Sequence, residues 1–178
     1  QDDTYDILRA NAEIGAFTKN AGGTAAYFGE LRPRGSKIRN NGVSNGAVSF
    51  MQKFQTTSNV ITQGQARRGY FAAYLPADHG DIEEFLECRE EGSKIQDIGL
   101  AVCFSDKFMT ETKEGKQENK KTLAKYHKKR FESGFPYAYF TDNVNRQRPQ
   151  VYKDKGMKLK TSQMCSEIME YVDDYVSF

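Results

Sequence analysis

Two continuous apolar runs constrain the fold of this chain more than any other feature. Residues 70–75 and 95–104 lack the polar alternation of a strand with one face in water. Such runs are typical of strands buried on both faces of a parallel sheet. Segments of helical spacing lie between and around them, so helix and strand alternate. The sequence therefore predicts an α/β fold with a mainly parallel sheet and with functional residues on loops beyond the carboxyl ends of the strands.

The other elements follow from apolar spacing and from capping residues. The predicted helices cover residues 3–20, 47–61 and 78–88. Ser105 and Asp106 are predicted to cap a further helix, and helical spacing resumes towards Arg130. Gly22 and Gly23 are predicted to end the first helix. A third strand is predicted over residues 137–140. No repeat, linker or domain boundary is evident, so residues 1–178 are predicted to be a single segment.

Charge narrows the classes of protein to which the chain can belong. Its 178 residues hold 26 Lys and Arg against 24 Asp and Glu, a net charge of +2, which is too small a bias to predict a polynucleotide partner. In the most basic stretch, residues 113–130, glutamates alternate with lysines. A solvated helix with i,i+4 pairs is therefore favoured over single-stranded nucleic-acid binding. No apolar run approaches the roughly 20 residues of a membrane span, and the acidic start is unlike a signal peptide.

Cysteine and histidine usage predicts the compartment and argues against a metal site. Cys88, Cys103 and Cys165 are an odd number with no close pair, which favours a reducing compartment and predicts a cytoplasmic protein. His79 and His127 lie far apart, and no Cys or His pair has metal-ligand spacing, so no bound metal is expected. We interpret His79 as a capping or packing residue, and Cys88 and Cys103 as small apolar fillers.

Two polar loops carry the first indication of a ligand. Residues 32–46 and 62–69 are rich in glycine, asparagine and arginine. Arginine offers a forked set of donors for phosphate, and glycine lets backbone amides approach an oxyanion. The loops suggest a nucleotide or another phosphorylated ligand. A pair of solvated turns is equally compatible with their composition, and neither loop has a Walker or G-x-G-x-x-G pattern.

Cys165 differs from the other cysteines in its neighbours, Gln163 and Glu167. In an extended segment, residues i and i+2 share a face, which would place an amide, a sulfur and a carboxylate on one surface. Such a set combines a reactive sulfur with a general base and an amide that orients a hydroxyl. A polar strand edge without chemistry is the alternative that the residues alone leave open.

The order of these motifs resembles the catalytic barrel of the large (alpha) subunit of class I ribonucleotide reductase. The matching motifs run in the same order through essentially the whole chain: Asp2-Asp3-Thr4, Gly22-Gly23, Leu31 to Ser36, Ser44-Asn45-Gly46, Gln63-Gly64 with Arg67-Arg68-Gly69, Ala73-Tyr74-Leu75, His79 with Asp81-Ile82 and Glu84-Phe85-Leu86, Ser105-Asp106 with Phe108-Met109, Glu132-Ser133-Gly134 with Pro136-Tyr137, Asp142 to Asn145, and Met164 to Ile168. The Met-Cys-Ser-Glu form of the last motif indicates class I.

The resemblance implies a set of catalytic residues. Cys165 matches the cysteine that becomes a thiyl radical and abstracts the ribose 3'-hydrogen, and Glu167 matches the carboxylate that takes the 3'-hydroxyl proton. Gln163 stands where the family usually has asparagine, so its amide reaches one methylene further. The implied activity is reduction of ribonucleotides to 2'-deoxyribonucleotides.

The resemblance also implies where substrate lies in this chain. Gly22 and Gly23 match backbone that lies against the bound ribonucleotide, and Gln63 and Arg67 belong to the loop assigned to the substrate base. That loop, residues 63–69, matches the second specificity loop of the family.

A second site, for a dNTP or ATP effector, is implied beside the first specificity loop, residues 36–46. Asp3 matches the residue that holds the effector ribose and Arg32 the residue that holds its phosphates, and Lys19 and Ile38 are assigned to the same site. Regulation of this kind needs two sites joined by a movable element, and the two loops meet that need.

The family's alpha subunit is several times longer than this chain and forms a ten-stranded α/β barrel. Its redox cysteine pair, substrate phosphate loop, tyrosine pair and cysteine tail have no counterpart here, so we expect an incomplete domain, one segment of a split enzyme. The chain itself is expected to hold no cofactor, and a metal-containing small (beta) subunit is expected to supply the radical. The other expected partners are the remaining large-subunit segments, a second alpha copy and thioredoxin or glutaredoxin. The alternative is a non-catalytic nucleotide-binding or assembly module of a split reductase.

Overall fold

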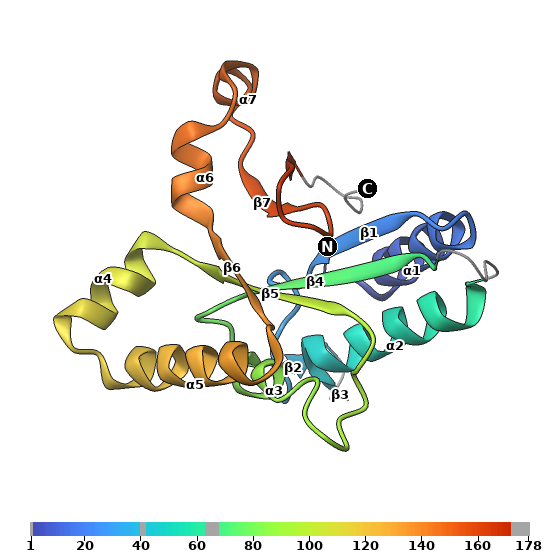
Figure 1. Ribbon diagram of the computed structural model, residues 1–178, viewed down its shortest axis with the longest axis horizontal. Helices are drawn as coiled ribbons and strands as arrows, with labels where there is room; N and C mark the ends of the chain where they lie inside the picture. The colour runs from blue at the N-terminus through green and yellow to red at the C-terminus, as the bar shows by residue number, and fades with distance from the viewer. Residues whose placement is uncertain (1, 40–41, 63–67, 172–178) are drawn as a thin grey trace.

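A four-stranded parallel sheet forms the centre of the structure (Figure 1), a computed structural model that describes residues 2–39, 42–62 and 68–171. Its strands lie in the order β1-β4-β5-β6. Their bounds are Gly23–Tyr27 for β1, Tyr70–Pro76 for β4, Gly99–Phe104 for β5 and Tyr137–Phe140 for β6. All three pairings are parallel, which confirms the predicted α/β class.

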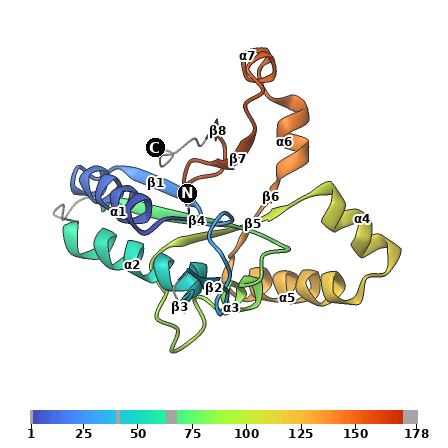
Figure 2. The same cartoon turned by 180° about the vertical axis from the view of Figure 1, so that it is seen from behind.

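One face of this sheet is covered by helices. These are α1 (Thr4–Lys19), α2 (Gly46–Ile61), the short α3 (Ile82–Leu86) and α5 (Gln117–Ser133), as Figure 2 shows from behind. Alternate residues of β4, among them Phe71 and Leu75, point into the core that these helices share with the sheet. Three aromatic rings pack against one another there, with centroids 5.3 to 6.2 Å apart: those of Phe28, Phe54 and Phe71.

The opposite face of the sheet is built from small residues and two tyrosines. Its buried members are Ala25, Ala72, Tyr74, Ala101, Cys103 and Tyr139. The antiparallel pair β7 (Leu159–Ser162) and β8 (Met169–Tyr171) lies over this face, and the partly buried Met164 and Met169 pack against it. Because alanines leave room above the strands, the segment between β7 and β8 approaches the sheet closely.

Five further elements complete the described chain. The hairpin of β2 (Lys37–Ile38) and β3 (Gly42–Val43) lies within the first polar loop. Helix α4 (Asp106–Glu114) is capped by Ser105, whose hydroxyl accepts from the Phe108 amide at 3.1 Å, as predicted. Helices α6 (Thr141–Gln147) and α7 (Gln150–Asp154) lead from β6 to β7.

The basic stretch on α5 is a solvated face on which Lys125, Lys128 and Lys129 are paired with acidic residues. Lys125 bonds Glu83 and Glu87 at 2.8 Å each, and Lys129 pairs with Glu90 and Glu132. Most of these partners belong to the region of α3, so the predicted i,i+4 pairing is accompanied by pairing between helices. Within the described residues, no helix combines the length and the apolar character of a membrane span.

Two predicted elements are shorter than their sequence patterns indicate. The helix predicted over residues 78–88 is α3 alone, because His79 and Asp81 turn their side chains towards residues 31, 34 and 47. The strand predicted over residues 95–104 begins only at Gly99. Before it, the amides of Gln96 and Asp97 both donate to Gln55 Oε1 on α2, at 2.8 and 3.0 Å, so this segment is bound to a helix instead of to β4.

The first helix ends within one residue of its predicted end, but the glycine pair is not what ends it. Helix α1 stops at Lys19, and it is capped by bonds from the Asn20 amide to the carbonyl of Phe17 and from the Ala21 amide to the carbonyl of Thr18, each at 3.0 Å. Ala21 follows with a φ of 60°, so the chain leaves the helix before the glycine pair. Gly23 is instead the first residue of β1, a strand that the alanine-rich segment did not reveal.

Candidate active site

Cys165 lies in a tight turn between β7 and β8, not in the extended segment that the sequence suggested. The amide of Ser166 donates to the carbonyl oxygen of Gln163 at 3.1 Å, which closes a four-residue turn. The side-chain oxygen of Gln163 also accepts from the amides of Cys165 and Ser166, at 2.6 and 2.7 Å. The assumption that Gln163, Cys165 and Glu167 share one strand face is therefore wrong. We call residues 163–166 the Cys165 turn.

The turn gives Cys165 an environment unlike that of the other two cysteines. Cys165 and Glu167 are exposed, whereas Cys88 and Cys103 are buried, and all three thiols are free. Burial, reinforced by neighbouring carboxylates, raises the pKa of Cys88 to about 12, and burial also raises the pKa of Cys103. Both are neutral fillers, as predicted, so Cys165 is the thiol that reaches solvent and reagents.

Two tyrosines of the sheet bind the Cys165 turn and the strand before it. The hydroxyl of Tyr74 on β4 donates to the carbonyl of Gln163 at 2.9 Å and lies 2.7 Å from Ser166 Oγ. The hydroxyl of Tyr139 on β6 donates to the carbonyl of Thr161 at 3.0 Å. The two rings pack edge to face, with centroids 5.7 Å apart. Neither role was predicted from the sequence, although a tyrosine within an alanine-rich buried run indicates a hydroxyl that needs a partner.

The glycine pair lies between the Cys165 turn and the end of the second loop. A Cβ on Gly23 would stand 2.3 Å from the Met164 sulfur, and a Cβ on Gly69 would stand 2.9 Å from the carbonyl oxygen of Gly22. The Tyr70 amide donates to that same oxygen at 3.3 Å. These close approaches need glycine, so the structure brings Gly22 and Gly23 together with the turn and with the start of β4.

The location of these glycines differs from the expectation for parallel sheets. Gly23 pairs with Tyr70, the first residue of β4, so the glycine pair lies at the amino ends of β1 and β4. Of the two polar loops, only the first follows the carboxyl end of a strand, which is β1. Gln63 and Arg67, which were also assigned to substrate, lie outside the described residues.

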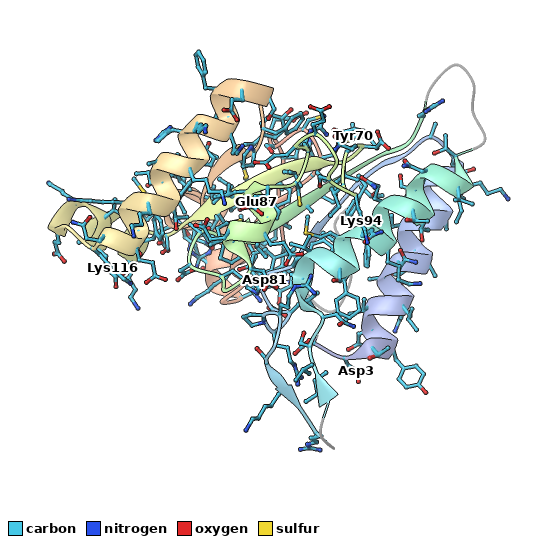
Figure 3. The ribbon with its side chains drawn as sticks, turned by 90° about the horizontal axis from the view of Figure 1, so that it is seen from below. Asp3, Tyr70, Asp81, Glu87, Lys94 and Lys116 are labelled. Atoms are coloured by element: carbon cyan, nitrogen blue, oxygen red, sulfur yellow. The ribbon has the colours of Figure 1, made fainter. Side chains whose placement is uncertain are left out.

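A cavity of about 590 Å³ lies beside the first polar loop and the start of α1. Its charged and polar lining includes Asp2, Asp3, Arg32, Arg39, Ser44 and Asn45. Asp3, Arg32 and Ile38, three of the four residues assigned to the effector, all line this cavity, whose size suits a nucleotide. Figure 3 labels Asp3 at the end of α1 beside the hairpin, far from Tyr70.

Within the cavity, the assigned residues have local partners. Asp3 caps α1, since its Oδ1 accepts from the Tyr5 amide at 2.8 Å. The guanidinium of Arg32 pairs with Asp2. Lys19 is the last residue of α1, and a helix of 16 residues is about 24 Å long, so within this chain Lys19 does not reach the cavity.

The rim of the cavity is attached to the end of β4 through buried side chains. Asp81 accepts from the amides of Arg34 and Ala47, at 2.8 and 2.7 Å, and thereby joins the loop to the start of α2. His79 Nε2 bonds the carbonyl of Leu31 at 2.7 Å, and its Nδ1 accepts from the Asp81 amide at 3.1 Å. The Nδ1 contact fixes the proton on Nε2, so His79 is a packing residue, as predicted.

In the part of the chain that the structure describes, no group of three or more His, Cys, Asp or Glu side chains is arranged to hold a metal ion.

Comparison with known proteins gives one consistent result. Residues 1–125 match the family model described as ribonucleotide reductase, barrel domain. The chain is 30% identical over 210 residues to the ribonucleoside-diphosphate reductase large subunit of Arabidopsis thaliana, and 29% identical over 213 residues to that of Plasmodium falciparum isolate Dd2. These alignments cover 94% and 96% of this chain but only 25% and 26% of the two relatives.

A solved structure extends the likeness to the coordinates. The alpha subunit of the class Id ribonucleotide reductase of Actinobacillus ureae superposes with a TM-score of 0.90 and is 39% identical. The match covers 98% of this chain and 32% of that one, whereas the family model ends at residue 125, before the Cys165 turn. The chain thus spans about a quarter to a third of the length of these relatives.

Proposed function

The chain belongs to the ribonucleotide reductase barrel-domain family, and on that premise we propose that it forms part of the large subunit of a class I ribonucleoside-diphosphate reductase. The observation that carries this proposal is the Cys165 turn, which presents one exposed thiol above the alanine-rich face of the sheet. In that role the chain contributes to the reduction of ribonucleotides to 2'-deoxyribonucleotides.

The proposed chemistry uses two exposed side chains of the segment that follows β7. The Cys165 sulfur, as a thiyl radical, takes the hydrogen atom from C3' of the ribose, which forms an S–H bond and leaves the radical on C3'. Glu167 accepts the proton of the 3'-hydroxyl, which eases loss of the 2'-hydroxyl as water. Both side chains are exposed in the structure, and so are accessible to a substrate.

Gln163 has a more limited part in this proposal than the resemblance implies. Its side-chain oxygen already accepts from two backbone amides of the turn, so only its Nε2 amide nitrogen remains to donate to a ribose hydroxyl. Gly23 lies close to Met164, and in the proposal its backbone and that of the preceding Gly22 form one wall of the same substrate site. Gln63 and Arg67 complete that site in the proposal.

The cavity beside the first polar loop is the proposed effector site. In the proposal Arg32 and Arg39 supply positive charge for the phosphates of a dNTP or ATP, and Asp3, which lines the same cavity, accepts from a ribose hydroxyl. Ile38 offers an apolar surface to the base. Lys19 joins this site only if it comes from a second alpha copy.

The remaining components of the proposed enzyme come from outside this chain. A metal-containing small subunit supplies the radical, thioredoxin or glutaredoxin supplies electrons, and further large-subunit segments complete the ten-stranded barrel. An alpha homodimer and a cytoplasmic location belong to the same proposal. The three free thiols suit a reducing compartment.

Turnover by the assembled large subunit tests the proposal. The wild-type assembly with its small subunit and a dithiol is expected to form deoxynucleotide from CDP or another ribonucleotide, and Cys165→Ser is expected to reduce formation to background. Cys88→Ala is the matched control, because Cys88 is buried and far in sequence from the turn. Undiminished turnover by Cys165→Ser would refute the catalytic role. Effector binding with no turnover by the wild-type assembly would favour the non-catalytic module.

A further inference from the structure

Tyr74, on β4 of the sheet, bonds the Cys165 turn at both of its ends. Its hydroxyl donates to the carbonyl of Gln163 at 2.9 Å and lies 2.7 Å from the hydroxyl of Ser166. A phenol has a single proton, so Ser166 is the donor in the second bond. Cys165 lies between the two bonded residues.

The bond to Ser166 supports a backbone conformation that is otherwise unfavourable. Ser166 has a φ of 68°, in the left-handed region that residues other than glycine rarely adopt. Such a residue persists only where its surroundings hold it in place. The Tyr74 hydroxyl and the two bonds from the Ser166 amide to Gln163 stabilise Ser166 in this conformation.

The position of Tyr74 within the sheet makes it a rigid anchor. Tyr74 is fully buried, lies in the middle of β4 and packs edge to face on Tyr139. Burial raises the pKa of Tyr74, with opposing hydrogen bonds from Ser166 and Ser162, so its proton remains available near neutral pH.

We infer that Tyr74 is a positioning residue for Cys165, because it spans Gln163 and Ser166 and thereby fixes the turn that presents the thiol. This inference rests on the proposed function for its catalytic consequence. A displacement of about 1 Å in a reacting group can cost about 10²-fold in rate, so the shape of the turn matters to the chemistry.

The first arm of the test needs no turnover. Hydrogen exchange at the amides of Cys165 and Ser166 is compared, in the complete large subunit, between wild type, Tyr74→Phe and Tyr126→Phe. Tyr126 is the matched control, because it is also buried but packs on the helical face of the sheet. We expect exchange to be about threefold to tenfold faster in Tyr74→Phe and unchanged in the control. Unchanged exchange in Tyr74→Phe would overturn the inference.

The second arm measures kcat and KM in the assembled enzyme. Tyr74→Phe is expected to lower kcat by about tenfold or more with little change in the KM for ribonucleotide, since the substrate wall is intact. Ser166→Ala is expected to act in the same way, and the double variant to be no worse than either single one. Normal kcat in Tyr74→Phe, despite faster exchange, would also overturn the inference. A wild-type assembly without turnover would instead refute the proposed function and leave the exchange arm to decide on Tyr74.

Discussion

Gly23→Ala is expected to displace Met164 and, with it, the Cys165 turn. The new Cβ would stand 2.3 Å from the Met164 sulfur, 3.0 Å from its Cε and 3.1 Å from its Cγ. Atoms of this kind normally approach to about 3.5–4.0 Å, so the overlap with the sulfur alone is about 1.2–1.7 Å. Because three atoms of one side chain are involved, rotation of the terminal methyl cannot relieve the contact. Either the Met164 side chain leaves the small-residue face, or the turn moves.

The magnitude follows from this overlap. Overpacking of a fitted site costs about 1–3 kcal/mol, so Gly23→Ala is expected to lower the free energy of unfolding by that amount. In a Met164→Ala background the obstacle is gone, and the same substitution is expected to be nearly neutral. The coupling energy of the double-mutant cycle should therefore be about 1–3 kcal/mol. Urea unfolding of the four proteins measures it.

Gly42→Ala is the control for this cycle. A Cβ on Gly42 would meet Ile38 at 3.6 Å, an ordinary contact, so its effect should lie within about 0.5 kcal/mol. The rate at which iodoacetamide alkylates Cys165 reports separately on the turn, because the other two thiols are buried. A Gly23→Ala protein as stable as the control, or an equal cost in the Met164→Ala background, would refute the reasoning.

Three further outcomes are expected. Asp81→Ala removes the buried acceptor of two backbone amides, those of Arg34 and Ala47, and should lower the free energy of unfolding by about 3–5 kcal/mol in urea titrations; near wild-type stability would contradict this. Arg32→Ala should weaken binding of a fluorescent dNTP about tenfold or more, whereas Arg34→Ala, outside the cavity lining, should not; equal effects would argue against the assigned cavity. Because burial raises the pKa of Cys88 to about 12, the folded thiol keeps its proton after the unfolded thiol has lost it. Stability should therefore fall by about 1.4 kcal/mol per pH unit above about pH 8.5, and Cys88→Ala should remove that part of the slope in thermal unfolding; identical slopes would contradict the assignment.

The sheet and its main helices follow from the sequence because their causes are local. A continuous apolar run such as residues 70–75 specifies a strand buried on both faces, and Ser105 supplies a helix cap three residues before the amide that it bonds. The predicted bounds of the two shortened elements are wrong because contacts between residues far apart in the sequence determine them. Asp97 lies 42 residues from Gln55, and no local pattern reveals that its amide bonds that side chain instead of a neighbouring strand.

The candidate site likewise combines features that local sequence predicts with features that depend on long-range contacts. Cys165 and Glu167 could be selected from their residue types and from the resemblance, but the shape of the turn could not. That shape depends on Tyr74, 89 and 92 residues away from its two partners, and on the side chain of Gln163 turning back on its own backbone. The assignment of Asp3 and Arg32 to one cavity was accessible to sequence comparison, whereas the separation of Lys19 from them follows from the length of α1.

An internal-competition isotope measurement tests the proposed hydrogen abstraction by Cys165 most directly. The assembled large subunit, with its small subunit and a dithiol, receives a mixture of CDP and CDP deuterated at C3', and mass spectrometry follows the isotope ratio of the remaining substrate. If Cys165 takes the 3'-hydrogen, the remaining CDP should become enriched in deuterium as the reaction proceeds, and Cys165→Ser should consume neither form. Consumption of both forms at equal rates, or turnover by Cys165→Ser, would contradict the proposed chemistry.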